Sequence, residues 1–315
     1  MTTPGQRMRN RVGRGEILPL IGVFDAFSAS LAGRHAEGIF LSGFGLAASH
    51  YGLPDIGFVA WPHVLDLAAR VRAVAPQAHM VVDIDDGYAD DQVAIHVARQ
   101  LERAGASGVI LEDQARPRRC GHLGGKNLLP IDTYLTRLEG VLDVCRDLFV
   151  IARTDASDPG EIRERVSAFS ATTVDAVLVD GQSSVESIQR LRALTEKPLA
   201  FNQILGGKSP SFALSELERA GALLAIFSTP LLFAAQAAME TCLEELRRNE
   251  MRLDAVTTTV RLPECQAVLE DNWKTARNTS GIPDFKREDE SARKETIVLG
   301  EAEDAETPSF SRLPR

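Results

Sequence analysis

Residues 107–113 read SGVILED, an almost wholly apolar run that ends in two acids. Seven other runs of the same kind are spread along the chain: PLIGVFDA (19–26), GIFLSG (38–43), HMVVDIDD (79–86), LFVIARTD (148–155), DAVLVDG (175–181), PLAFNQ (198–203) and LLAIFSTP (223–230). None shows the alternation of apolar and polar residues that marks a half-exposed strand. The runs are therefore typical of parallel strands buried on both faces.

Amphipathic stretches with helical spacing separate these runs, as in DDQVAIHVARQLERAG (90–105) and IDTYLTRLEGVLDVC (131–145). Eight strand-helix units between residues 17 and 248 predict an α/β fold, a (β/α)8 TIM-type barrel with extra C-terminal helices. A doubly wound open sheet is the alternative. It would need a phosphate-binding GxGxxG fingerprint after its first strand, and FDAFSASLAG (24–33) has none.

We expect four regions along the chain. Residues 1–14 form an N-terminal arm, and residues 15–250 form the catalytic barrel. Residues 251–282 form a helical extension that closes the barrel or packs on another subunit, with Trp273 as an anchor. Residues 283–315 mix both charges with few apolar side chains, which is typical of a tail that is disordered or becomes ordered on a partner.

Composition narrows the class of function. A net charge of -9 argues against a nucleic-acid binder, which needs a basic surface for phosphates. No apolar run approaches the length that spans a membrane, and the first residues lack the apolar core of a secretory signal, so we expect a cytoplasmic protein. The four cysteines are far apart, which indicates neither a disulfide framework nor a zinc cluster. Cys145 and Cys242 lie among apolar helical positions, where we expect small core residues.

The loop after residues 107–113 carries the strongest functional signal. Residues 112–130, EDQARPRRCGHLGGKNLLP, combine two acids, four cations, a cysteine and a histidine. A loop of this length is either a solvated surface excursion or a functional lid, and its chemistry and glycines favour a lid. Its cations are suited to an anionic substrate, and they are Arg116, Arg118, Arg119 and Lys126.

Acids gather where the predicted strands end, which is the end of a barrel that carries its chemistry. Asp83, Asp85 and Asp86 follow one strand and Glu112 follows the next. A single polar strand end often only marks the approach to solvent. Several carboxylates around one opening repel each other unless a cation lies between them, and hard oxygen ligands favour Mg²⁺ or Mn²⁺.

The order and spacing of five motifs resemble the phosphoenolpyruvate mutase/isocitrate lyase superfamily. They are SGFGLAASHYGLPDIGF (42–58), VDIDDGY (82–88), LEDQARPRRCGHLGGK (111–126), IARTDA (151–156) and FNQILGGKSP (201–210). The chain most resembles the branch of 2-methylisocitrate lyases and carboxyphosphonoenolpyruvate phosphonomutases. This resemblance implies a (β/α)8 barrel with Mg²⁺, α-carboxylate substrates, a mobile gating loop, and dimers or tetramers in which a C-terminal helix packs on a neighbouring subunit.

The resemblance also implies roles for individual residues. The metal-shell acids would be Asp83, Asp85, Glu112 and Asp55. The substrate-binding residues would be Ser42, Gly43, Phe44, Arg118, Gly121, Asn202 and Ser209. The catalytic residues would be Cys120, His122, Arg153 and Asp180. Cys120 would be the proton donor, while His122 would be an acid or base, an orienting group or only loop surface.

Several positions depart from the pattern of the lyases. Asp180 stands where they carry a glutamate, and Arg118 stands where they carry a lysine. Asp86 makes the predicted metal end more acidic. Phe44 replaces a smaller residue, so its ring either narrows the pocket, stacks on an apolar substituent or packs in the core. Cys120 has the alternative of an inert buried thiol, which its polar loop disfavours.

Three functions are consistent with these residues. The first is a Mg²⁺-dependent carbon-carbon lyase that releases a 2-oxo acid from a 2-hydroxy di- or tricarboxylate. The second is a phosphonomutase that moves a phosphoryl group between oxygen and carbon. The third is a barrel that binds a dicarboxylate or a partner without turnover. The Cys-Gly-His step and residues 151–156 favour the lyase.

Overall fold

The computed structural model describes residues 2–119, 121, 124–257 and 259–280. Cys120 and His122 lie outside this set, and so does the tail predicted for residues 283–315. Residues up to Ser280 form one compact unit. The domain boundaries given above stay predictions.

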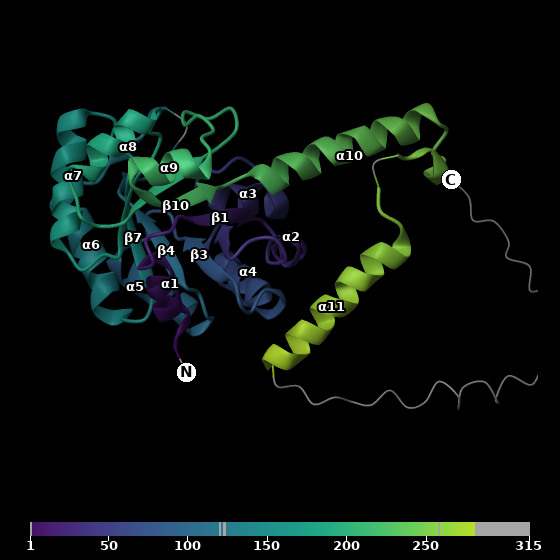
Figure 1. Ribbon diagram of the computed structural model, residues 1–315, viewed down its shortest axis with the longest axis horizontal. Coiled ribbons are helices and arrows are strands. Elements are labelled where there is room, and N and C mark those ends of the chain that lie inside the picture. The colour runs from purple at the N-terminus through teal and green to yellow at the C-terminus, as the bar shows by residue number, and fades with distance from the viewer. Residues whose placement is uncertain (1, 120, 122–123, 258, 281–315) are drawn as a thin grey trace, which may run out of the picture. The chain divides into compact units, whose positions relative to one another are not determined.

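Eight parallel strands close into a barrel in the order β1-β10-β9-β8-β7-β4-β3-β2 (Figure 1). Each coincides with one of the apolar runs, and the bounds are β1 Leu18–Val23, β2 Gly38–Leu41, β3 His79–Asp83, β4 Gly108–Glu112, β7 Phe149–Thr154, β8 Ala176–Val179, β9 Leu199–Gln203 and β10 Ala222–Phe227. The predicted (β/α)8 barrel with extra helices is confirmed.

Helices follow each strand and pack around the outside of the barrel. They are α2 Ala26–Ala32, α3 Gly43–Tyr51, α4 Trp61–Val74, α5 Asp91–Arg103, α6 Ile131–Val144, α7 Pro159–Ala171, α8 Val185–Arg192, α9 Leu214–Ala220 and α10 Pro230–Arg248. Several begin at a side chain that accepts a backbone hydrogen bond, such as Asp25 before α2 and Asp90 before α5. Between β4 and α6, the short strands β5 Gln114–Ala115 and β6 Asn127–Leu128 pair as a hairpin at the base of the predicted lid.

The barrel interior is a packed apolar core. Alternate residues of each strand face inward, as the period of two requires, and they include Phe40, Val81, Ile110, Ile151 and Leu178. Helix α1 Pro4–Val12 covers the end of the barrel at which the strands begin, because its Met8 and Val12 belong to the same buried cluster. The sequence predicted only an arm there, but this segment is a helix capped by Thr3.

A second and larger cluster lies between the strands and the surrounding helices, and it contains Cys145. The predicted burial of Cys145 is therefore confirmed. Cys242 is only half-buried, and none of the residues of its helix α10 is buried. Helix α11 Leu262–Ser280 contacts α4, and its Trp273 is largely exposed rather than anchored in this chain. Of the helices that the structure describes, none combines the length and apolar character of a membrane span.

Candidate active site

Strand alternation brings polar side chains together at the end of the barrel where the strands finish. The inward face of β4 runs from Ile110 to Glu112, and that of β7 runs from Ile151 to Arg153. The same step of two places other polar residues above the apolar core, and they are Ser42, Asp83, Asp180, Asn202 and Ser228. The strands therefore deliver both acids and a cation to one opening.

These side chains line a cavity of about 30 Å³. Its floor is formed by inward apolar residues of the barrel, including Phe40, Ile110 and Leu178. Nine of the predicted site residues reach it, and they are Ser42, Phe44, Asp55, Asp83, Arg118, Gly121, Arg153, Asp180 and Asn202. This volume is far below that of ordinary small-molecule sites. A di- or tricarboxylate requires some of the lining to move.

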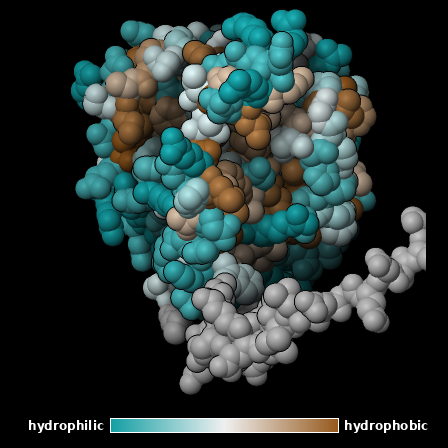
Figure 2. Space-filling model, turned by 90° about the vertical axis from the view of Figure 1, so that its right-hand side faces the viewer, coloured by the Kyte–Doolittle hydropathy of each residue, from teal (hydrophilic) through white to brown (hydrophobic). Residues whose placement is uncertain are grey.

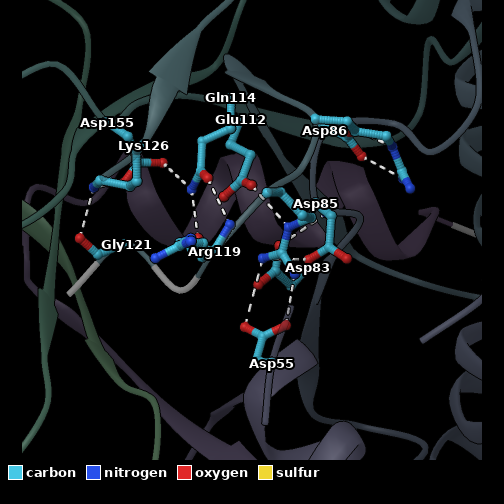
Figure 3. Close-up of polar contacts among 12 residues, drawn as sticks. Asp55, Asp83, Asp85, Asp86, Glu112, Gln114, Arg119, Gly121, Lys126 and Asp155 are labelled. Carbon is cyan, nitrogen blue, oxygen red and sulfur yellow. Dashed lines mark hydrogen bonds and ion pairs between the residues drawn. The ribbon is translucent and has the colours of Figure 1, made fainter. Parts of the chain in front are cut away.

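The guanidinium of Arg118 lies among the predicted metal acids Asp55, Asp85 and Glu112, which Figure 3 labels. Its nitrogens are 2.6 Å from Asp55 Oδ1, 2.9 Å from Asp85 Oδ1 and 3.0 Å from Glu112 Oε1. Arg118 itself is buried, although it belongs to the loop. The sequence placed Arg118 beside a substrate, but in this structure its charge compensates the protein's own acids.

Burial raises the pKa of three acids in this cluster, because the charged form loses its hydration. The pKa of Glu112 rises to about 8. Burial also raises the pKa of Asp83, and that of Asp85 well above its ordinary value. Arg118 and Arg153 oppose this effect at Asp83 and Glu112 without overcoming it. If all of the carboxylates in this cluster were ionised, their negative charge would exceed the positive charge of the two arginines, so burial favours protonation of some of them.

The residues present fit a hard divalent cation in three respects. Their donors are carboxylate oxygens, which Mg²⁺ and Mn²⁺ prefer. Two buried oxygens of this set, Asp85 Oδ1 and Glu112 Oε2, accept no hydrogen bond and make only ion pairs, with Arg118 at 2.9 Å and with Arg153 at 3.3 Å. A Cβ on Gly43 would lie only 3.2 Å from Asp85 Oδ1, so the glycine keeps the approach to the acids open.

The acids are not yet arranged around a cation. In the described part of the chain, no three acidic, histidine or cysteine side chains surround a common point as metal ligands do. The Arg118 guanidinium lies between the acids at hydrogen-bonding distance and fills that space. A cation bound by these acids would compete with Arg118 for that space.

A second polar chain crosses four strands on the other side of the cavity. Arg153 Nη2 donates to Asp180 Oδ2 at 3.0 Å, and Asn202 Nδ2 donates to Asp180 Oδ1 at 3.1 Å. Ser228 Oγ in turn donates to Asn202 Oδ1 at 2.6 Å. These bonds fix the Arg153 fork toward the cavity, where it can receive an anionic oxygen. The shorter Asp180, in place of a glutamate, reaches Arg153 directly.

The loop closes over this chain at Gly121. A Cβ on this residue would lie 1.9 Å from Asp180 Oδ2 and 2.3 Å from Arg153 Nη2, so only glycine allows the approach. Lys126 Nζ donates to the Gly121 carbonyl and to Asp155 Oδ1, each at 2.6 Å. Cys120 and His122 flank Gly121 in the sequence, but their positions lie outside the described residues.

The side chains that hold the lid loop against the barrel could be predicted only in part from the sequence. Gln114 holds both sides of the loop, because it bonds the Arg119 backbone at two points and Asp155 at 3.1 Å. Although burial raises the pKa of Asp155, Arg153 and Lys126 together hold it below its ordinary value. Lys126 was predicted as a loop cation, and Asp155 ends one of the predicted strands. No sequence pattern near Gln114 indicated that its side chain would hold the loop.

The remaining predicted residues lie at the rim of the cavity. Ser42 caps α3 by accepting from Gly45, so the first backbone N–H groups of α3 begin beside the acids. The Phe44 ring both lines the cavity and packs edge-on against Phe233, with ring centroids 6.3 Å apart. Ser209 is buried, and its Oγ makes no hydrogen bond within the described residues.

Asp86 does not add to the metal end. Its carboxylate turns away from the cluster and accepts from Arg116 at 2.7 Å (Figure 3). Arg137 also donates to the Asp86 backbone carbonyl. Three of the four loop cations, Arg116, Arg118 and Lys126, thus bind acids of the protein rather than facing an open substrate site.

Several known proteins are similar to this chain in sequence. The chain is 32% identical to the petal death protein of Dianthus caryophyllus over 72% of its length and 74% of that protein. It is 28% identical to 2-methylisocitrate lyase of Aeropyrum pernix, covering 80% of this chain and 82% of that one. It is also 28% identical to the chloroplastic carboxyvinyl-carboxyphosphonate phosphorylmutase of Arabidopsis thaliana, covering 87% and 85%.

Solved structures of enzymes have the same fold as this chain. Oxaloacetate acetylhydrolase in complex with 3,3-difluorooxalacetate superposes with a TM-score of 0.81 at 28% identity, covering 90% of this chain and 99% of that one. The structure of 2,3-dimethylmalate lyase, a member of the PEP mutase/isocitrate lyase superfamily, has a TM-score of 0.82 at 27% identity, with coverage of 91% and 98%. Residues 9–247 match the family described as phosphoenolpyruvate phosphomutase. The chain therefore belongs to that family and is an enzyme of the phosphoenolpyruvate mutase/isocitrate lyase superfamily.

Proposed function

We propose that the protein is a Mg²⁺- or Mn²⁺-dependent carbon-carbon lyase. Its substrate is a 2-hydroxy di- or tricarboxylate of the isocitrate or methylisocitrate type, and its products are a 2-oxo acid and a carboxylate. The observation that carries the proposal is the two-sided cavity. Acids for a cation lie on one side, the Arg153–Asp180 pair lies on the other, and a lid closes between them at Gly121.

The two sides of the cavity bind different groups of the substrate. Arg153 receives a carboxylate or the hydroxyl oxygen of the substrate, because its fork is held toward the cavity by Asp180. The backbone N–H groups at the start of α3 receive a second carboxylate, favoured by the helix dipole. The divalent cation, when bound by Asp83, Asp85 and Glu112 with Asp55 nearby, supplies positive charge that stabilises a developing oxyanion.

The reaction moves one proton off oxygen and one onto carbon. The hydroxyl proton passes to a carboxylate at the cavity, for which we propose Asp180. The electron pair left on oxygen forms the carbonyl of the 2-oxo acid as the adjacent carbon-carbon bond breaks. The pair from that bond stays on carbon, stabilised by the neighbouring carboxylate. Cys120 then gives its thiol proton to this carbanion, and His122 lies next but one to it in the sequence.

Lid closure excludes water from the carbanion. In the closed arrangement Gly121 touches Arg153 and Asp180, and Lys126 and Gln114 fasten the loop to Asp155. A substrate enters when Arg118 and Gly121 withdraw, since the closed cavity is too small for it. The apolar floor keeps the dielectric constant low around the reacting groups, which strengthens their electrostatic interactions.

A phosphonomutase is the second candidate. The family that the chain matches is described as phosphoenolpyruvate phosphomutase, and a phosphorylmutase is among the relatives at 28% identity. The same arginine and cation site would receive a phosphonate. The Cys120 donor favours the lyase, because transfer of a phosphoryl group needs no proton delivered to carbon.

We also propose that the protein is a homodimer or homotetramer that buries α10 and α11. Helix α10 has no buried residue of its own. Large apolar side chains of both helices are exposed, and they include Met239, Leu243, Leu262, Leu269 and Trp273. Figure 2 shows several separate apolar patches on an otherwise largely hydrophilic face. A second copy of the chain would cover such residues.

One experiment tests the activity. The protein with Mg²⁺ is incubated with a panel of 2-hydroxy acids and phosphonates, while release of 2-oxo acid and the phosphorus NMR spectrum are followed together. We expect 2-oxo acid from at least one 2-hydroxy acid. A phosphorus shift without cleavage would instead establish the mutase, and no change in either signal would contradict both.

A pair of variants tests the proposed proton donor. Cys120→Ser should lose turnover while its affinity for the substrate, measured by calorimetry, stays near that of the parent. Cys265→Ser is the matched control, because Cys265 is half-buried on α11 outside the cavity. Full activity of Cys120→Ser would remove the thiol from the mechanism.

A further inference from the structure

A second cavity lies at the end of the barrel where the strands begin. Its volume is about 700 Å³, and its walls come from α1, the connection between α2 and β2, and the residues that lead into β3. His79 at the start of β3 lines it, whereas Asp83 at the end of the same strand lines the catalytic cavity. The two sites therefore occupy opposite ends of one strand.

Positive charge dominates the walls of this cavity. Four arginines line it, Arg7, Arg11, Arg14 and Arg34, against the one acid Glu37. Glu37 pairs with Arg11 at 2.6 Å, and Arg34 pairs with Asp271 of α11 at 2.9 Å. Within the part of the chain that the structure describes, neither Arg7 nor Arg14 makes an ion pair. This excess of cations occurs in a chain whose net charge is -9.

A further cation, Arg72, lies next to this cavity, and no acid is among the groups that shift its pKa. Arg72 stands behind the wall, where its Nη1 donates to the carbonyls of Ala75, Pro76 and Ala78. Its Nε and Nη2 are buried and donate to no partner among the described residues. Burial and the charge of Arg7 lower the pKa of Arg72 to about 10. Burial and Arg7 also lower the pKa of His79, although Glu37 opposes the shift. An anion placed in the cavity would remove this mutual repulsion.

We propose that this cavity is a binding site for a small phosphorylated ligand, of the class of inorganic pyrophosphate and nucleoside diphosphates. Arginine forks match phosphate oxygens in geometry and charge. The volume exceeds that of a single phosphate and suits a molecule of nucleotide size. The site is separate from the proposed lyase chemistry, because it shares no lining residue with the catalytic cavity.

Calorimetry with inorganic pyrophosphate and with ADP tests the proposal. The full chain is titrated in EDTA, so that metal-bridged binding at the catalytic acids does not contribute. We expect one site per chain that weakens as salt rises. The double variant Arg7→Gln/Arg14→Gln should weaken binding at least tenfold. Arg70→Gln should bind as the parent does, because Arg70 is exposed on α4 and outside the cavity.

The outcomes separate the possible ligands. Binding of ADP but not pyrophosphate assigns the site to a nucleotide, and binding of both assigns it to the diphosphate group. If the double variant fails to fold by circular dichroism, Arg14→Gln alone serves, because Arg14 is exposed and lies beyond the end of α1. The proposal is overturned if neither probe binds at millimolar concentration, if the variants bind as the parent does, or if an oligonucleotide binds there in preference to both probes.

Discussion

Nη1 of Arg118 lies 2.6 Å from Oδ1 of Asp55, and through this bond a residue of the lid is seated among the acids of the barrel. Two further ion pairs join the same guanidinium to Asp85 and Glu112. The lid cation and a divalent cation would compete for one space. Lid position and cation binding should therefore be linked.

Replacing Arg118 tests this competition. Arg118→Gln removes the charge that occupies the acid cluster, so Mn²⁺ should bind more tightly, by about tenfold or more given the short distances involved. Electron paramagnetic resonance of free Mn²⁺ at fixed pH measures the affinity. Arg119→Gln is the control, because Arg119 is the exposed neighbour. Weaker or unchanged Mn²⁺ binding in Arg118→Gln would show that the arginine does not compete.

Gly121 provides a test of lid closure. Gly121→Ala places a Cβ against Asp180 and Arg153, so the lid cannot close and turnover should fall by about a hundredfold or more. The melting temperature should stay near that of the parent, because the change affects a loop. Gly124→Ala is matched to it in the same loop, where a Cβ meets nothing within 4 Å. Equal activity of the two variants would argue against the closed arrangement.

A buried ion pair outside the cavity, Arg165 with Asp113, should contribute to the stability of the fold rather than to activity. Arg165 Nη1 donates to the fully buried Asp113 at 3.0 Å. Arg165→Met leaves this carboxylate without its cation and should lower the free energy of unfolding by about 3 to 5 kcal/mol. Urea denaturation followed by circular dichroism measures the change. Arg163→Met, on an exposed position of the same helix, should alter it little, and an equal loss in both would refute the role of the pair.

Cys145 gives a prediction about pH. Burial raises the pKa of its thiol from 9.0 to about 12. The thiol stays protonated in the folded protein while the unfolded chain releases its proton. This contribution to stability is therefore present below pH 9 and is lost as the pH rises from 9 to 12. Cys145→Ala should show a shallower alkaline loss in urea denaturation than the parent, and Cys265→Ala should not. Identical slopes would contradict the raised pKa.

The barrel was predictable because each of its strands is continuous and apolar. Parallel strands buried on both faces leave that pattern directly in the sequence. The polar side chains that face inward at the mouth of the barrel could also be predicted. Ile110 and Glu112, or Ile151 and Arg153, are two residues apart, which is one strand repeat. The motifs then named most of the side chains that meet at the cavity.

The pairing of charges was not predictable in the same way. Nothing local distinguishes Arg116, which binds Asp86, from Arg118, which binds Asp55, because each partner lies far away in the sequence. The Gln114 clamp depends on how the loop folds back on itself. The Phe44 ring lines the cavity and packs on Phe233, and the alternatives given for its role stay predictions.

Crystals grown with Mn²⁺ and oxalate, measured at the manganese absorption edge, test the central claim most directly. We expect an anomalous peak about 2 Å from oxygens of Asp83, Asp85 or Glu112, with the Arg118 side chain displaced from the acids. A peak elsewhere, or no peak at saturating Mn²⁺ while Arg118 keeps its bond to Asp55, would contradict a cation site at this end of the barrel.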